Sequence, residues 1–141
     1  MSAALCDANV VVKWFHDEPG DETPAARRLA LASEDGLVDL RVLDLTYYEA
    51  GNVFRKSGRS ASVIAGVLAQ LLEICGPGIV MERHRWPAVA EVAERYGLTF
   101  YDAAYVAIAD QHQLTLITAD KVMIKAGGVL PSVFLKTLAA P

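Results

Sequence analysis

Apolar and polar residues follow two different periods along the chain, and the two periods alternate. Short apolar runs of the kind that form buried strands occupy residues 3–6, 38–43, 79–81, 114–118 and 133–138. Segments with the composition or spacing of helices occupy residues 9–15, 25–33, 45–56, 60–74, 86–96, 103–113 and 121–126. This alternation predicts an α/β fold, arranged as a three-layer α/β/α sandwich with a mainly parallel central sheet.

Capping residues set the expected ends of several helices. Thr23 followed by Pro24 is typical of an N-cap with proline at the first helical position. Ser60 or Ser62 can cap the long helix that ends before the Gly-Pro-Gly turn, and Gly97 suits the position just after the helix at 86–96. For these helices the sequence therefore predicts the boundaries as well as the helix itself.

Length and composition indicate one domain, covering residues 1–141, because 53% of the residues are apolar and can fill a core on both faces of a sheet. Cys6 and Cys75 lack metal-ligand spacing, and no export signal is seen, so we expect a reduced, cytoplasmic protein. The apolar stretch 61–75 is too short to span a bilayer, which favours a buried or dimer-forming helix. A net charge of −4 argues against a protein that coats nucleic acid, although local basic patches are compatible with it.

Four acidic residues stand where the predicted elements meet. Asp7 and Asp120 follow predicted strands, Asp102 precedes a predicted helix, and Glu49 lies in the first turns of another. Strand exits and the helix starts beside them share one edge of a parallel sheet, which is where ligands bind in α/β folds. Each acid also has a structural interpretation, as an N-cap, as the third residue of a capping box or as an acid at a helix N-terminus.

The expected convergence of these acids has an electrostatic consequence. Two carboxylates about 4 Å apart repel by roughly 4 kcal/mol at an effective dielectric of about 20, so a group of four must take up protons or hold a cation. Oxygen ligands suit Mg²⁺ or Mn²⁺. Such an ion can activate a water for phosphodiester hydrolysis, so no Ser, Cys or His nucleophile is required.

Four short motifs carry a resemblance to a known family: LCDAN at residues 5–9, YEAGN at 48–52, YDAAY at 101–105 and TAD at 118–120. Together they resemble the PIN-domain ribonucleases of the VapC toxin type, over nearly the whole chain. The resemblance implies an α/β/α sandwich that cleaves RNA endonucleolytically with Mg²⁺ or Mn²⁺. It further implies a homodimer and a cognate antitoxin that inserts a peptide near the acidic site. The metal ligands and catalytic residues it implies are Asp7, Glu49, Asp102 and Asp120.

Four further residues are candidates for supporting roles. Asn52 and Thr118 match family positions that hydrogen-bond a carboxylate or a water, although a surface Asn and a strand Thr would look the same in sequence. Lys13 and Lys121 lie close in sequence to Asp7 and Asp120, so we expect them to contact RNA phosphates if they are not ordinary solvated surface.

Two other classes of protein are compatible with acids at strand ends. A phosphatase-like or receiver-like domain usually carries paired acids at its first strand, whereas residues 7–9 supply one. A non-catalytic PIN-like module that binds RNA or protein could have lost one of the four acids, and none is missing. Metal-dependent cleavage of RNA would separate the nuclease from both.

Overall fold

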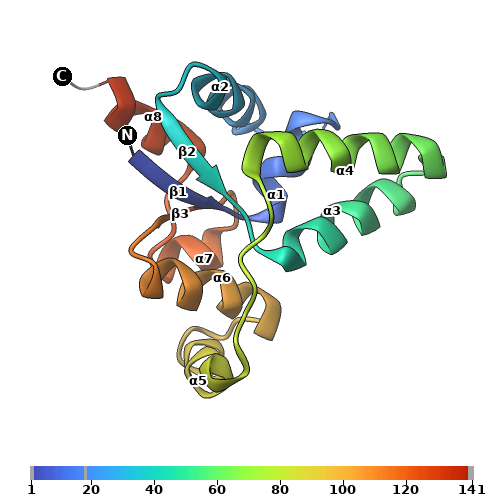
Figure 1. Ribbon diagram of the computed structural model, residues 1–141. Helices are drawn as coiled ribbons and strands as arrows, with labels where there is room; N and C mark the ends of the chain where they lie inside the picture. Colours follow the sequence, from blue (N-terminus) through green and yellow to red (C-terminus); the bar gives the residue numbers. More distant parts are fainter. Residues whose placement is uncertain (1, 18, 140–141) are drawn as a thin grey trace.

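The central sheet has the parallel arrangement that the sequence predicts. The computed structural model describes residues 2–17 and 19–139, so Glu18 and both ends of the predicted domain lie outside it. Within the described part, three strands pair in the order β2-β1-β3 (Figure 1). They are β1 (Ser2–Cys6), β2 (Val38–Arg41) and β3 (Thr115–Ile117), all parallel.

Helices cover both faces of the sheet. Their bounds are α1 (Ala8–Val11), α2 (Thr23–Glu34), α3 (Asp44–Lys56), α4 (Ala61–Cys75), α5 (Trp86–Tyr96), α6 (Phe100–Gln111), α7 (Lys121–Lys125) and α8 (Pro131–Ala139). Two 3₁₀ turns, Val12–Trp14 and Arg83–Arg85, continue α1 and precede α5. Helices α3 and α4 run side by side and project away from the sheet (Figure 1). No helix in the described residues is long and apolar enough to cross a membrane.

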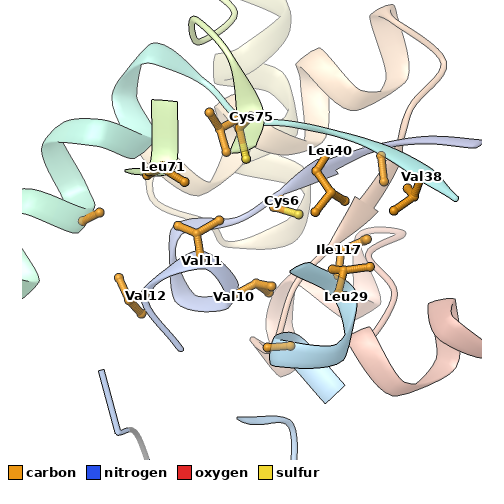
Figure 2. Close-up of a cluster of buried hydrophobic side chains, with 14 of the residues drawn as sticks. Cys6, Val10, Val11, Val12, Leu29, Val38, Leu40, Leu71, Cys75 and Ile117 are labelled. Carbon is orange, nitrogen blue, oxygen red and sulfur yellow. The ribbon is translucent and has the colours of Figure 1, made fainter. Parts of the chain in front are cut away.

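Two hydrophobic clusters fill the space between the sheet and the helices, one on each face of the sheet. On one face Cys6 and Ile117 pack with Leu29 of α2 and Leu71 of α4 (Figure 2). On the other face Leu5 packs with α5, α6 and α7. Since successive side chains of a strand point to opposite faces, this split follows from the alternation along β1. The predicted three-layer α/β/α sandwich is confirmed.

Local capping explains which predicted boundaries are correct. The Ser60 hydroxyl accepts a hydrogen bond from the Val63 amide, so Ser60 rather than Ser62 caps α4. Gly97 ends α5 in the left-handed conformation, with φ of 66°. The N-cap expected at Thr23 is wrong, because Glu22 occupies that position and Thr23 is the first helical residue.

The strand predicted at residues 133–138 is wrong, because this segment forms α8. Phe134 and Leu138, four residues apart, both pack on the first cluster, which is the spacing of a helix face. Ser132 donates from its amide and its hydroxyl to the Glu22 carboxylate at the start of α2. These contacts join the first turn of α8 to the first turn of α2, and they depend on residues that are far apart in sequence.

The strand predicted at residues 79–81 is reduced to one bridge. Ile79 pairs in parallel with Leu43, accepts from the Asp44 amide and donates to the Val42 carbonyl. Gly78 allows this approach, because a Cβ there would lie 2.2 Å from the backbone nitrogen of Asp44. The segment therefore touches the end of β2 without extending the sheet by a full strand.

Candidate active site

Asp7 lies where β1 ends, and its carboxylate is buried. Its side chain is 4% exposed and its Oδ2 accepts a hydrogen bond of 2.9 Å from the Thr118 hydroxyl. Asp7 precedes α1 in the N-cap position, but it makes no side-chain capping hydrogen bond. Asp7 therefore holds the N-cap position predicted for it, but its carboxylate is bonded to Thr118 at the end of β3 and does not cap α1 through a side-chain hydrogen bond.

Thr118 connects the ends of β1 and β3. Its Oγ1 donates to Asp7 and accepts from the Asp120 amide at 3.0 Å. Asn9 adds a second connection, because its Oδ1 accepts from the Ala119 amide at 3.1 Å and its Nδ2 lies 3.5 Å from Thr118 Oγ1. Sequence reasoning proposed Thr118 but missed Asn9, whose only signal is its position two residues after Asp7.

Glu49 is half-buried on α3, and its partner comes from another helix. Glu49 Oε1 accepts a hydrogen bond of 2.7 Å from the Tyr105 hydroxyl of α6. The expected capping-box role of Glu49 is wrong, because α3 begins at Asp44 and Thr46 is its third residue. Thr46 Oγ1 accepts from the Leu43 amide at 3.0 Å. Glu49 lies beyond the positions that cap the helix, so capping does not explain it.

Asp102 lies in the first turn of α6 and is not the N-cap of that helix. Thr99 is the cap, and its hydroxyl accepts from the Asp102 amide at 3.1 Å. Helix α6 therefore begins at Phe100, three residues before the predicted start. The pattern Thr-x-x-Asp at residues 99–102 resembles a capping box and could have indicated this start from the sequence.

Asp120 is the acid whose structural interpretation is confirmed. It is the N-cap of α7, and its Oδ1 accepts a hydrogen bond of 2.9 Å from the Val122 amide. A carboxylate offers several acceptor sites on its two oxygens, so this capping bond leaves room for a second partner. Asp120 therefore caps a helix and stands beside the other acids at the same time.

The carboxylates interact electrostatically. Burial raises the pKa of Asp7 to about 7 against the lowering effect of the Thr118 hydrogen bond, and the charges of Asp102 and Glu49 raise it further. Burial also raises the pKa of Glu49, with a contribution from Asp102, although the Tyr105 hydrogen bond lowers it. Burial raises the pKa of Asp102, and the neighbouring Asp120 charge adds to this. The four acids therefore form one electrostatically linked group.

A hollow of about 360 Å³, here called the acidic hollow, opens beside these residues. Its polar lining residues are Asp7, Asn9, Lys13, Glu49, Asn52 and Asp102. Lys13 is a buried residue of this lining and is 9% exposed. Lys121 is an exposed residue at the start of α7, and neither it nor Asp120 belongs to this lining. The structure thus brings Lys13 and Asn52 to three of the four acids.

The acids have the donor chemistry that Mg²⁺ and Mn²⁺ require, although no group of three or more His, Cys, Asp or Glu within residues 2–17 and 19–139 is already arranged to hold an ion. Mg²⁺ keeps several of its waters and takes one or two carboxylates from the protein, so a complete cage is not needed. A cation would also offset both the burial of the Asp7 and Asp102 charges and the repulsion that adds to it in raising their pKa values. The residues that fit this role are Asp7, Glu49, Asp102 and Asp120.

The sequence matches a family model and a curated protein. A model of the PIN domain matches residues 4–129. A curated relative, Exonuclease VapC9 from Pyrobaculum aerophilum, is 37% identical over 86 residues, which cover 60% of this chain and 65% of the relative. The match thus spans slightly less than two thirds of that relative's length.

Solved structures match the chain over most of its length. The crystal structure of PAE2754 from Pyrobaculum aerophilum superposes with a TM-score of 0.70 and 29% identity, covering 99% of both chains. The crystal structure of FitAcB from Neisseria gonorrhoeae gives a TM-score of 0.62 at 21% identity, covering 92% of this chain and 98% of that one. At 21% identity, this second match supports the fold only.

Proposed function

The chain belongs to the PIN-domain family, and on that premise we propose that it is a metal-dependent ribonuclease with its active site at the acidic hollow. The observation that carries the proposal is the buried Asp7 carboxylate, whose pKa is raised to about 7 beside Glu49 and Asp102. A carboxyl group whose pKa is strongly shifted by burial and by specific charged neighbours, and which lies in a cleft, is a candidate for a functional site. The relative named VapC9 supports nuclease chemistry for this proposal.

Asp7, Glu49, Asp102 and Asp120 are the proposed ligands of Mg²⁺ or Mn²⁺. When bound, the ion would offset charge on the phosphate and lower the pKa of water, which is the chemistry that hydrolysis of a phosphodiester needs. The protein orients its carboxylates for this task through hydroxyl groups of other elements. Thr118 holds Asp7, and Tyr105 holds Glu49.

Lys13 is the proposed phosphate contact. Lys13 lines the acidic hollow. Its ammonium group can therefore compensate the negative charge of an RNA phosphate that lies next to the carboxylates. Hydrolysis adds the elements of water across the bond between phosphorus and a bridging oxygen, leaving a phosphate on one RNA fragment and a hydroxyl on the other. Asn52 lines the same hollow and can donate to a phosphate oxygen or orient a water.

Cleavage of a mixed RNA pool with Mn²⁺ tests this proposal. We expect cleavage that stops on addition of EDTA and falls by about 100-fold or more in Asp7→Asn, because a displaced carboxylate misplaces the reacting groups. Asp110→Asn is the matched control, since Asp110 lies on α6 outside the lining of the acidic hollow. Metal-independent cleavage, or an Asp7→Asn variant as active as the natural protein, would contradict the proposal.

The same assay separates internal cleavage from cleavage at RNA ends. The sequence resemblance implies an endonuclease, whereas the curated relative is named an exonuclease. We propose internal cleavage, and a circular RNA tests it because such a substrate has no end to attack. Linearisation of the circle is expected, and degradation of the linear RNA alone would show an exonuclease. RNA binding without any cleavage would instead indicate a non-catalytic module.

We further propose that the protein is the toxin of a toxin–antitoxin pair and that it acts in the cytoplasm as a homodimer. An apolar groove of about 520 Å³ lies beside α4, lined in part by Leu68, Leu72 and Val80. Exposed apolar surface of this kind fits a protein partner. The proposed antitoxin peptide would reach the acidic hollow with a basic side chain. Light scattering tests the dimer, and co-purification with the product of the neighbouring gene tests the antitoxin.

A further inference from the structure

Tyr105 is a buried residue of α6. It is the last residue of the YDAAY motif at 101–105, but it is not one of the candidate site residues named from the sequence. Its side chain is 0% exposed, and its hydroxyl donates to Glu49 Oε1 at 2.7 Å. Thr46 Oγ1 lies 2.7 Å from the same hydroxyl oxygen, and the Leu43 amide donates to Thr46 Oγ1 at 3.0 Å. A chain of three hydrogen bonds thus runs from the start of α3 through α6 to Glu49.

The chemistry of each group fixes the direction of every hydrogen bond in this chain. The Leu43 amide can only donate, so Thr46 Oγ1 is the acceptor there and keeps its own hydrogen, which it donates to Tyr105 if the single Tyr105 hydrogen is used elsewhere. The Tyr105 hydrogen is then directed to Glu49, because an ionised carboxylate only accepts. Hydrogen bonds linked in this way strengthen one another in a buried setting.

We propose that Tyr105 is a positioning residue, whose hydroxyl fixes the Glu49 carboxylate at the acidic hollow. The inference rests on the proposed ribonuclease function. Asp102 lies on α6 three residues before Tyr105, so both face the same side of that helix. Helix α6 therefore sets the place of two acids, Asp102 directly and Glu49 through the phenol of Tyr105.

A simpler explanation is that a buried tyrosine satisfies its hydroxyl with the nearest acceptor, as buried tyrosines usually do. Tyr47 offers a matched control for this explanation, because it lies on the same helix as Glu49 and its hydroxyl donates to the Gly76 carbonyl. Tyr47→Phe therefore removes a similar hydrogen bond without touching a carboxylate. A purely structural hydroxyl would give the same result in both variants.

The test compares Tyr105→Phe with Tyr47→Phe for Mn²⁺ binding, followed by the paramagnetic resonance signal of free Mn²⁺, and for the kinetics of RNA cleavage. We expect Tyr105→Phe to bind Mn²⁺ about 10–100-fold more weakly, which is typical when the group that orients a metal ligand is lost. Its kcat should fall while its KM for RNA stays unchanged. Tyr47→Phe should lower the urea midpoint, because it also loses a hydrogen bond, but it should bind Mn²⁺ as the natural protein does.

Equal Mn²⁺ affinity in Tyr105→Phe and the natural protein would overturn the inference. If Asp7→Asn abolished binding in the same series, the proposed function would still stand. A natural protein that binds no Mn²⁺ and cleaves no RNA would overturn both. Should Tyr105→Phe fail to fold, Thr46→Ser and Thr46→Val decide: Ser restores the hydroxyl and should restore affinity relative to Val, whereas equal affinity in the two would reject a role for the chain of hydrogen bonds.

Discussion

Helix α6 borders two hollows, and they differ in chemistry more than in size. Its N-terminal end carries Asp102 to the acidic hollow of about 360 Å³. Its C-terminal end carries Asp110 to a larger hollow of about 640 Å³, which also contacts α5 and β3. Among the described residues lining the larger hollow, Asp110 is the only carboxylate, and it shares the space with Arg85 and Arg95.

Electrostatic interaction among carboxylates, and not volume, distinguishes the acidic hollow from the larger one. In the larger hollow the charges have mixed signs, because Asp110 is accompanied by Arg85 and Arg95. In the acidic hollow, burial raises the pKa of Asp7 and the charges of Asp102 and Glu49 raise it further, while burial and the charge of Asp102 raise the pKa of Glu49. The smaller hollow is therefore the one in which a bound cation would remove an existing repulsion.

The largest effect that distinguishes the two hollows concerns stability against pH. The pKa of Asp7 rises from 3.8 to about 7 on folding, so between these values the folded protein holds a proton that the unfolded chain releases. Stability from this group is thus complete below the lower value and lost as pH rises through about 7, a decrease of about 4 kcal/mol.

Urea unfolding in EDTA from pH 4 to pH 8 measures this decrease. Asp7→Asn should make the pH dependence shallower, leaving the part that comes from Glu49 and Asp102, and should be more stable than the natural protein at pH 8, since it removes the buried Asp7 charge. Asp110→Asn, in the larger hollow, should follow the natural curve. Parallel curves for Asp7→Asn and the natural protein would show that the buried carboxyl titrates normally.

A smaller effect is expected at the two threonines of the β3 region. Thr118→Ala removes the donor to Asp7 and the acceptor of the Asp120 amide, so the free energy of unfolding should fall by about 1–3 kcal/mol. Thr118→Ser keeps the hydroxyl and should lose less. Thr115 is exposed beside the larger hollow, and Thr115→Ala should stay within about 0.5 kcal/mol. Equal losses at both threonines would argue against a special role for Thr118.

Elements with local signals could be predicted from the sequence. Helix α5 has the predicted bounds because both of its ends carry a local signal. Pro87 lies in its first turn, and Gly97 follows its last residue. The sequence predicts a strand where α8 lies, because the period of so short an apolar segment does not distinguish a strand from a helix. The observed helix is joined to Glu22 at the start of α2 through Ser132. The tertiary contact decides the conformation there.

In the candidate site, too, some features could be predicted from local sequence signals and others could not. Asp7 and Asp120 could be placed at the sheet edge because each follows a strand in the sequence. The partner of Glu49 could not be predicted, because Tyr105 lies 56 residues away and reaches it through the packing of α6 on the sheet. Only the fold shows which hydroxyl holds which carboxylate.

The most direct test of the central claim is a calorimetric titration of Mn²⁺ into the natural protein, Asp102→Asn and Asp110→Asn. Thr99 caps α6, so both variants should keep that helix and remain within about 1 kcal/mol of the natural stability. The natural protein and Asp110→Asn are expected to bind Mn²⁺ alike, whereas Asp102→Asn should bind at least about 10-fold more weakly. Binding to Asp102→Asn as tight as to the natural protein, or equal weakening in Asp110→Asn, would contradict an ion site at the acidic hollow.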